Sequence, residues 1–193
     1  MSSSLTFSSL LLLLLTSTTL VQVEALPPTP NNSSLFTYTG LHGIFAAPAP
    51  KSFKASKVSA TEFPSLTGHD VSLTVLQFPP GGLNPPHVNV RASGLFIVLK
   101  GRVEVGFVDL GDKLYTQILE AGDVFVFPKG LVHYQYNVDK RKAATALAAF
   151  GSTGAGTYTI PSTIFGSGIR DEILAMSFNI DVDSIRKLKD GIE

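Results

Sequence analysis

The sequence predicts an all-β fold of the sandwich or barrel type, followed by short helices near the C-terminal end. From residue 69 onward, short runs rich in Val, Leu, Ile, Thr and Phe are separated by turn signals with Gly, Asp and Pro. Residues 102–109 alternate cleanly, with Val103, Val105 and Phe107 on one face. After residue 151 the apolar residues take helical spacing. The length of 193 residues suits one domain.

The predicted strands differ in how much of each is apolar. Residues 95–99 are continuously apolar, which predicts a strand buried on both faces. The two-residue link Lys100-Gly101 predicts a hairpin that joins this strand to residues 102–109. The remaining β-type runs are residues 69–78, 114–119, 124–127, 131–138 and 143–150, the last small and apolar enough for a central strand.

The strand at residues 131–138 carries a polar face. A period of two places His133, Gln135 and Asn137 on one side, and apolar or aromatic residues on the other. These three side chains therefore face the same region of the fold, whether as ligands or as a hydrogen-bonded lining.

Two short helices are predicted at residues 169–178 and 182–189, because apolar residues recur there at helical spacing. Asp181 is placed to cap the second helix. Helices this short are marginal alone, so their apolar stripes need a partner surface. That surface is either the edge of the barrel or another subunit.

Residues 1–25 are predicted to be a secretory signal peptide. An unbroken leucine run at residues 10–15 is followed by Val-Glu-Ala, with the small residue that signal peptidase requires before a cut after Ala25. No Lys or Arg precedes the run, which departs from the usual pattern. A buried core helix and a membrane anchor are the alternatives, but the run is short and interrupted by Ser and Thr.

The mature chain, residues 26–193, is divided by composition. Residues 26–56 are rich in Pro, Ser, Asn and Ala and predict an arm that lies over a surface. Residues 57–150 form the predicted barrel core, and residues 151–193 the C-terminal helical part. The mature chain has 15 basic and 14 acidic residues, so its formal charge is 15 minus 14, or +1. This near-neutral balance without a basic cluster argues against a nucleic-acid partner.

The chain has no cysteine, so a secreted form must rely on core size, oligomerisation or a metal for stability. Asn31 and Asn32 each begin an Asn-x-Ser sequon in a polar segment flanked by prolines. Either is a predicted glycosylation site if the chain is secreted.

Two segments carry residues at motif spacing. In the first, five residues separate Gly81 from His87, one residue separates His87 from Asn89, and Gly94 and Gly101 follow. In the second, Gly122 is followed at fixed intervals by Pro128, Gly130, His133 and Asn137. Because alternate residues of a strand share a face, positions 87 and 89 can converge on one point with His133.

These two segments resemble the boxes of the germins and germin-like proteins of plants, a branch of the cupin superfamily. Those boxes read G-x5-H-x-H-x3-4-E-x6-G and G-x5-P-x-G-x2-H-x3-N, and the second is matched at every defined position. The resemblance covers essentially the mature chain. It implies a single cupin β-barrel of jelly-roll type with short C-terminal helices, secretion to the apoplast, and assembly from dimer to hexamer. It also implies one manganese ion held by three histidines and a glutamate.

The first box departs from the family at two ligand positions. Asn89 stands where a histidine is expected, and Gly94 where the glutamate is expected. His87 and His133 remain as strong ligands, while Asn89 offers only a neutral amide oxygen. Loss of two ligands predicts weakened metal binding, since even outer-shell changes cost roughly 10 to 100-fold in affinity. Alternatively, His87 and His133 are simply polar lining in the mouth of a barrel.

Three functions remain open from the sequence. The first is a manganese enzyme, an oxalate oxidase or a superoxide dismutase. The second, which we favour, is a non-catalytic extracellular cupin, an oligomer associated with the wall or with defence, or one that binds a small ligand. The third is storage. Asn84 matches a position where some family members hold substrate, but a turn residue before Pro85 is the preferred interpretation.

Overall fold

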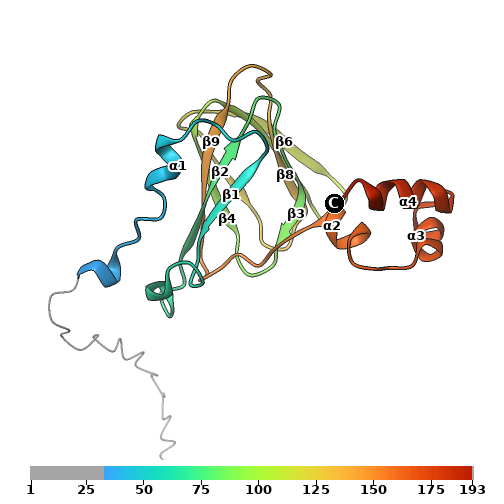
Figure 1. Cartoon of the computed structure of the whole chain (residues 1–193), viewed down its shortest axis with the longest axis horizontal. Helices are drawn as coiled ribbons and strands as arrows, with labels where there is room; N and C mark the ends of the chain where they lie inside the picture. The colour runs from blue at the N-terminus through green and yellow to red at the C-terminus, as the bar shows by residue number, and fades with distance from the viewer. Residues whose placement is uncertain (1–32, 193) are drawn as a thin grey trace, which may run out of the picture. The chain divides into compact units, whose positions relative to one another are not determined.

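The computed structural model describes residues 33–192 (Figure 1). The predicted signal peptide and the two sequon residues Asn31 and Asn32 lie outside this range. The strands are β1 (Lys54–Val58), β2 (Ser72–Phe78), β3 (Leu83–Asn89), β4 (Gly94–Lys100), β5 (Arg102–Val108), β6 (Leu114–Glu120), β7 (Val124–Phe127), β8 (His133–Asn137), β9 (Ala144–Phe150) and β10 (Thr157–Thr159). The helices are η1 (Ser33–Phe36), α1 (His42–Ala46), η2 (Pro64–Leu66), α2 (Ile160–Phe165), α3 (Asp171–Phe178) and α4 (Val182–Asp190).

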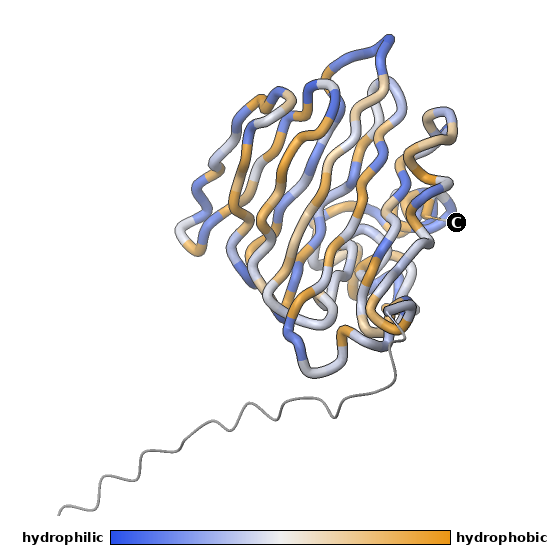
Figure 2. The backbone as a smooth tube through the Cα atoms, turned by 90° about the vertical axis from the view of Figure 1, so that its left-hand side faces the viewer, coloured by the Kyte–Doolittle hydropathy of each residue, from blue (hydrophilic) through white to orange (hydrophobic). Residues whose placement is uncertain are grey.

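Two antiparallel sheets of five strands form the barrel core. Sheet A has the order β1-β2-β9-β4-β7, and sheet B has the order β10-β3-β8-β5-β6. Alternate residues of β9 are buried along its whole length, and it lies between β2 and β4, so the predicted central strand is confirmed. Buried residues of both sheets pack in one cluster that includes Phe78, Phe96, Val103 and Val105. Figure 2 shows hydrophobic residues, in orange, recurring along the strands, as expected where two sheets pack on each other.

The predicted hairpin across Lys100-Gly101 is wrong. β4 pairs with β7 and β9 in sheet A, whereas β5 pairs with β6 and β8 in sheet B. Gly101 has φ +86°, and a Cβ at this position would lie 2.8 Å from the Cβ of Ala144. The tight glycine turn therefore passes the chain from one sheet to the other, which a count of linking residues does not distinguish from a hairpin.

The predicted burial of residues 95–99 on both faces is also not observed within the chain. Phe96 and Val98 are fully buried, but Leu95 and Leu99 are 50% and 44% exposed. The inner face of β4 packs in the core, while its outer face belongs to an apolar surface of sheet A. The apolar run is continuous because one face of β4 packs in the core and the other face forms part of an exposed apolar surface.

Several elements were not predicted from the sequence. The segment predicted as an arm, residues 26–56, contains α1, and β1 extends across its C-terminal end. The main chain of α1 is tied to β2, because Gln77 Nε2 donates to Ile44 O at 3.2 Å. The short strand β10 and helix α2 follow the loop at residue 151. These elements are short or rich in Pro, Ser and Thr, so their hydrophobic period is too brief to be recognised.

The two predicted C-terminal helices correspond to α3 and α4. Asp181 caps α4 as expected, since its carboxylate accepts from Ser184 N at 2.8 Å. Leu174 and Ile185 are buried in a small cluster between these helices. Among residues 33–192, no helix is both long enough and apolar enough to cross a membrane.

Candidate functional site

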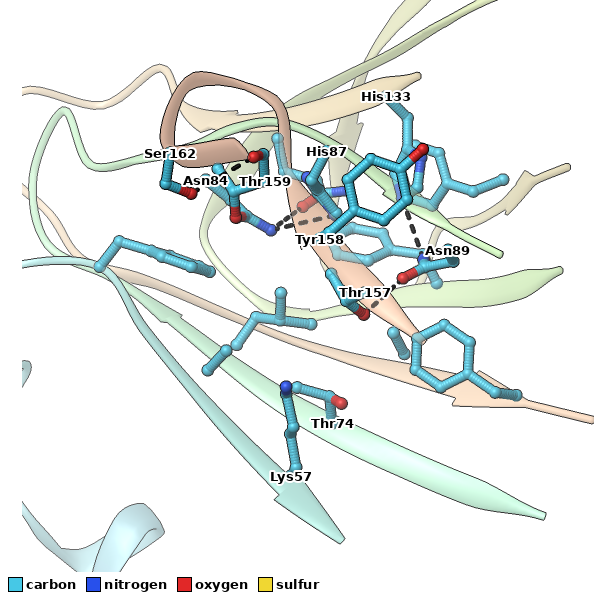
Figure 3. Close-up of a pocket in the computed structure, with 18 of the residues that line it drawn as sticks. Lys57, Thr74, Asn84, His87, Asn89, His133, Thr157, Tyr158, Thr159 and Ser162 are labelled. Carbon is cyan, nitrogen blue, oxygen red and sulfur yellow. Dashed lines mark hydrogen bonds between the residues drawn. The ribbon is translucent and has the colours of Figure 1, made fainter. Parts of the chain in front are cut away.

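A cavity of about 420 Å³ lies between the two sheets (Figure 3). Its two walls differ in chemistry. Sheet B supplies the buried polar side chains Asn84, His87, Asn89, His133 and Gln135. Sheet A supplies mostly apolar side chains, and the segment that runs from β10 into α2 closes another side with hydroxyl groups.

His87 on β3 and His133 on β8 face each other as direct cross-strand partners. Their ring centroids are 4.1 Å apart. The pairing register of β3 shifts between Asn84 and His87, where two prolines interrupt the ladder. The shift turns the end of β3 so that His87 and Asn89 both point into the cavity. The predicted convergence of positions 87, 89 and 133 is therefore present in the structure.

Both imidazole rings are oriented by the backbone. His87 Nδ1 lies 2.8 Å from Pro85 O, and His133 Nδ1 lies 2.9 Å from Leu131 O. A carbonyl oxygen can only accept, so each Nδ1 carries the proton. The neutral rings consequently present the Nε2 lone pair to the cavity, which is the tautomer that a metal ligand requires.

Burial favours the neutral form of both histidines. Desolvation lowers the pKa of His87, and the hydrogen bond to Pro85 O opposes this shift. Desolvation and the charge of His87 lower the pKa of His133 to about 4, against the opposing effect of the bond to Leu131 O. The pair is thus uncharged near neutral pH.

The polar wall is largely satisfied within itself. Asn84 Nδ2 donates to Gln135 Oε1 at 2.6 Å and lies 3.5 Å from His87 Nε2. Asn89 Nδ2 is 3.1 Å from His133 Nε2 and donates to its lone pair. Asn84 is therefore a strand residue with a buried amide at the cavity, and the interpretation as a turn residue was wrong. Asn84 pairs with Gln135, and the register shift that follows at the prolines, which lets both Asn84 and His87 face the cavity, cannot be read from composition.

Asn89 also connects the polar wall to β10. Its Oδ1 accepts a hydrogen bond from Thr157 Oγ1 at 2.6 Å. The two residues are register partners of β3 and β10. The amide nitrogen faces His133 because Nε2 of that ring carries no proton and can only accept, which leaves Oδ1 to accept from the Thr157 hydroxyl.

Phenyl rings surround Gly94. Gly94 pairs across the sheet with both Phe127 and Phe150. A Cβ at Gly94 would lie 3.0 Å from Phe150 Cε1. Phe127 stacks on the ring of His133 with centroids 4.5 Å apart. The space beside this glycine is therefore apolar and already filled.

Some lining residues were not anticipated from the sequence. Lys57 on β1, Phe150 on β9 and Thr157 on β10 all line the cavity. β1 and β10 are the edge strands that the sequence interpretation missed, so no signal pointed to Lys57 or Thr157. Within residues 33–192, no three or more His, Cys, Asp and Glu side chains gather as a candidate metal site.

The fold and the paired histidines define the class of protein as a cupin, and the family model for cupins matches residues 47–186. Putative germin-like protein 9-2 and germin-like protein 9-3 of Oryza sativa subsp. japonica are 50% and 48% identical, covering 80% and 81% of this chain and 73% and 75% of their own lengths. The structure of oxalate oxidase with the substrate analogue glycolate superposes with a TM-score of 0.77 at 30% identity, covering 86% of this chain and 84% of that protein. The chain belongs to the germin-like proteins.

Proposed function

We propose that this chain is a non-catalytic, extracellular germin-like cupin that does not hold manganese tightly. The observation that carries the proposal is the pair Gly94 and Phe150. The resemblance places a carboxylate ligand at position 94, but this chain has no side chain there and a buried phenyl ring lies against the glycine. His87 and His133 are the strong ligands that remain.

The donor set does not fit a site built from three histidines and a glutamate. Asn89 presents its NH₂ group to His133 Nε2, and its oxygen is engaged by Thr157. A cation would have to displace this amide and would find no anionic group in the cavity lining. Two neutral nitrogens without a carboxylate are a poor set for a hard divalent ion. The two histidines act in this proposal as hydrogen-bonded lining, with weak metal binding as their residual capacity.

Secretion and assembly are part of the proposal. The leucine run before Ala25 supports export to the apoplast, with glycan at Asn31 or Asn32. Apolar residues on the outer face of sheet A support a homo-oligomer: Leu95 and Val126 are 50% and 53% exposed. The C-terminal helices add further exposed apolar side chains, among them Met176, Phe178 and Leu188.

Metal analysis tests the central claim. The full chain is produced with manganese in the medium, and its metal content is measured by mass spectrometry alongside oxalate oxidase and superoxide dismutase activity. We expect far less than one manganese per chain and neither activity. Near-stoichiometric manganese that is lost in a His87→Ala variant would contradict the proposal and favour the manganese enzyme.

A restored site provides the matched control. The triple change Asn89→His, Gly94→Glu and Phe150→Ala supplies both missing ligands and removes the ring that contacts position 94. If the missing ligands limit binding, this variant takes up manganese under conditions in which the unmodified chain does not. Equal metal content in both proteins would show that the two positions are not what limits binding.

A further inference from the structure

We propose that the cavity binds a small aromatic carboxylate without a metal, with the carboxylate against Lys57 and the ring against the phenyl groups of sheet A. This inference deepens the proposed function and depends on it, because it assigns a ligand to a barrel that carries no tightly bound ion. Three independent features of the cavity lead to it: its charge, its apolar wall and the hydrogen-bonding state of its polar wall.

The lining of the cavity has a positive bias. Lys57 contributes its ammonium group, which points into the cavity in Figure 3 close to Thr74. No Asp or Glu lines the cavity, and none of the ion pairs among residues 33–192 includes Lys57. The carboxylate of Glu62 lies in a neighbouring cleft that Lys57 also lines; it accepts hydrogen bonds from Ser59, and the nearby charge of Lys57 contributes to lowering its pKa. The lining of the cavity itself thus holds one cation and no anion, and a single negative charge complements it.

The apolar wall favours a flat ring. Phe96, Phe127 and Phe150 line it, and each is at most 8% exposed. Phe96 and Phe127 already meet edge to face, with centroids 5.6 Å apart. Aromatic ligands gain most from such surroundings, because offset or edge contacts add to the burial of apolar area. The volume of about 420 Å³ lies within the range of small-molecule sites.

The polar wall argues against a second carboxylate on the ligand. The Nε2 atoms of His87 and His133 are acceptors, and that of His133 already accepts from Asn89 Nδ2, so neither ring can donate to a carboxylate. The amide donors Asn84 and Asn89 are engaged with neighbouring side chains. A monocarboxylate with an apolar body suits this arrangement, whereas a compact dicarboxylate would need a cation beside the histidines.

Three probes separate the requirements for a charge and for a ring. Binding of benzoate, benzamide and oxalate to the full chain is measured by calorimetry and NMR in the presence of EDTA. We expect benzoate to bind more tightly than benzamide, which has the ring without the charge, and than oxalate, which has charge without a ring. Equal binding of benzamide, tighter binding of oxalate, or no binding of benzoate at millimolar concentration would overturn the inference.

A matched pair of variants locates the charge. Lys57→Met removes the ammonium group from the cavity, while Lys54→Met removes one from the same strand three residues earlier, on the opposite face; both lysines are exposed, so they differ in the face they occupy. We expect Lys57→Met to weaken benzoate binding roughly tenfold and leave benzamide unchanged, since one charge-assisted hydrogen bond is lost. Equal effects of the two variants would contradict the assignment.

The outcomes distinguish this inference from the proposed function. If the metal-free protein does not bind benzoate, the inferred ligand is wrong, while the proposal of a non-catalytic cupin is unaffected. Benzoate binding that disappears with EDTA and returns with manganese overturns both, because a metal would then carry the ligand.

Discussion

Phe150 fills the space into which a side chain at Gly94 would project. The two residues are cross-strand partners of β9 and β4, and a Cβ on Gly94 would lie 3.0 Å from Phe150 Cε1. Phe150 is only 8% exposed and lines the cavity, so a side chain at position 94 would push its ring towards that space. The relationship couples the two positions: a larger residue at one requires a smaller residue at the other.

This coupling can be measured as stability. We expect Gly94→Ala to lower the free energy of unfolding by about 1 kcal/mol, because the added methyl group overpacks a buried contact. The cost should fall in a Phe150→Leu background, measured by urea unfolding as a double-mutant cycle. Gly151→Ala is the control, since no atom lies within 4 Å of its Cβ position. Additive effects of the two substitutions would argue against the contact.

The histidine pair predicts a pH dependence of stability. The pKa of His133 is lowered from 6.5 to about 4 in the folded chain, so the unfolded chain binds the extra proton between these values. The contribution of His133 to the free energy of unfolding is therefore complete above pH 6.5. It is lost as the pH drops towards 4, which lowers the free energy of unfolding by up to about 3 kcal/mol. The free energy of unfolding measured at pH 7, 5.5 and 4 checks this slope.

The control for the pH effect is His133→Asn, which keeps a buried polar group but does not titrate. We expect its stability to change less with pH over the same interval. The carboxylates with lowered pKa, such as Asp139 and Asp181, lose their contribution only at lower pH and affect both proteins alike. An unchanged slope in the variant would assign the pH dependence to other groups.

The side chain of Asn137 forms hydrogen bonds to the main chain, and its substitution is expected to cause a large loss of stability. It is fully buried, and its Nδ2 donates to Pro79 O at 2.9 Å and to Lys142 O at 2.8 Å. Its Oδ1 accepts from Asp139 N at 3.1 Å. Asn137→Ala leaves these backbone groups unpaired, so we expect a loss of about 3 kcal/mol in chemical unfolding. Gln117→Ala on the exposed surface of β6 should change stability by less than about 0.5 kcal/mol. A small loss at Asn137 would mean that water replaces these bonds.

The outer face of sheet A predicts where copies of the chain meet. Leu73, Ala149, Leu95 and Val126 lie in register across four strands, with no charged residue among them. We expect Val126→Lys to shift the protein towards monomer in light scattering, because a buried lysine would lose its hydration. Leu110→Lys is the matched control, since Leu110 is 96% exposed on a turn. A monomeric unmodified protein, or equal effects of both variants, would exclude this face as the interface.

The sequence predicted the strands whose pattern is long and regular. β5, β6, β7, β8 and β9 lie within one or two residues of their predicted bounds, because alternation over five or more residues, or a Pro or Gly boundary, fixes them locally. Which strands pair is a non-local matter. The link at Lys100-Gly101 is as short as a hairpin loop, yet it joins the two sheets, and nothing within those two residues distinguishes the outcomes.

The site was predicted in part, for a similar reason. His87, Asn89 and His133 were expected to converge, and they do, because motif spacing and strand period define them. Lys57 and Phe150 were missed, since each reaches the cavity only through the packing of the two sheets. The hydrogen-bond partner of the Asn89 oxygen, Thr157, is 68 residues away in sequence.

The hydrogen bonds from His87 to Pro85 O and from His133 to Leu131 O join each ring to the main chain two residues earlier. Each histidine thereby takes its orientation from the chain segment just before it, and an ion is not needed to hold either ring in place. The orientation of the two rings and the occupancy of the centre are consequently separate properties. Substitutions at positions 89 and 94 would therefore leave both rings directed at the cavity by these backbone contacts.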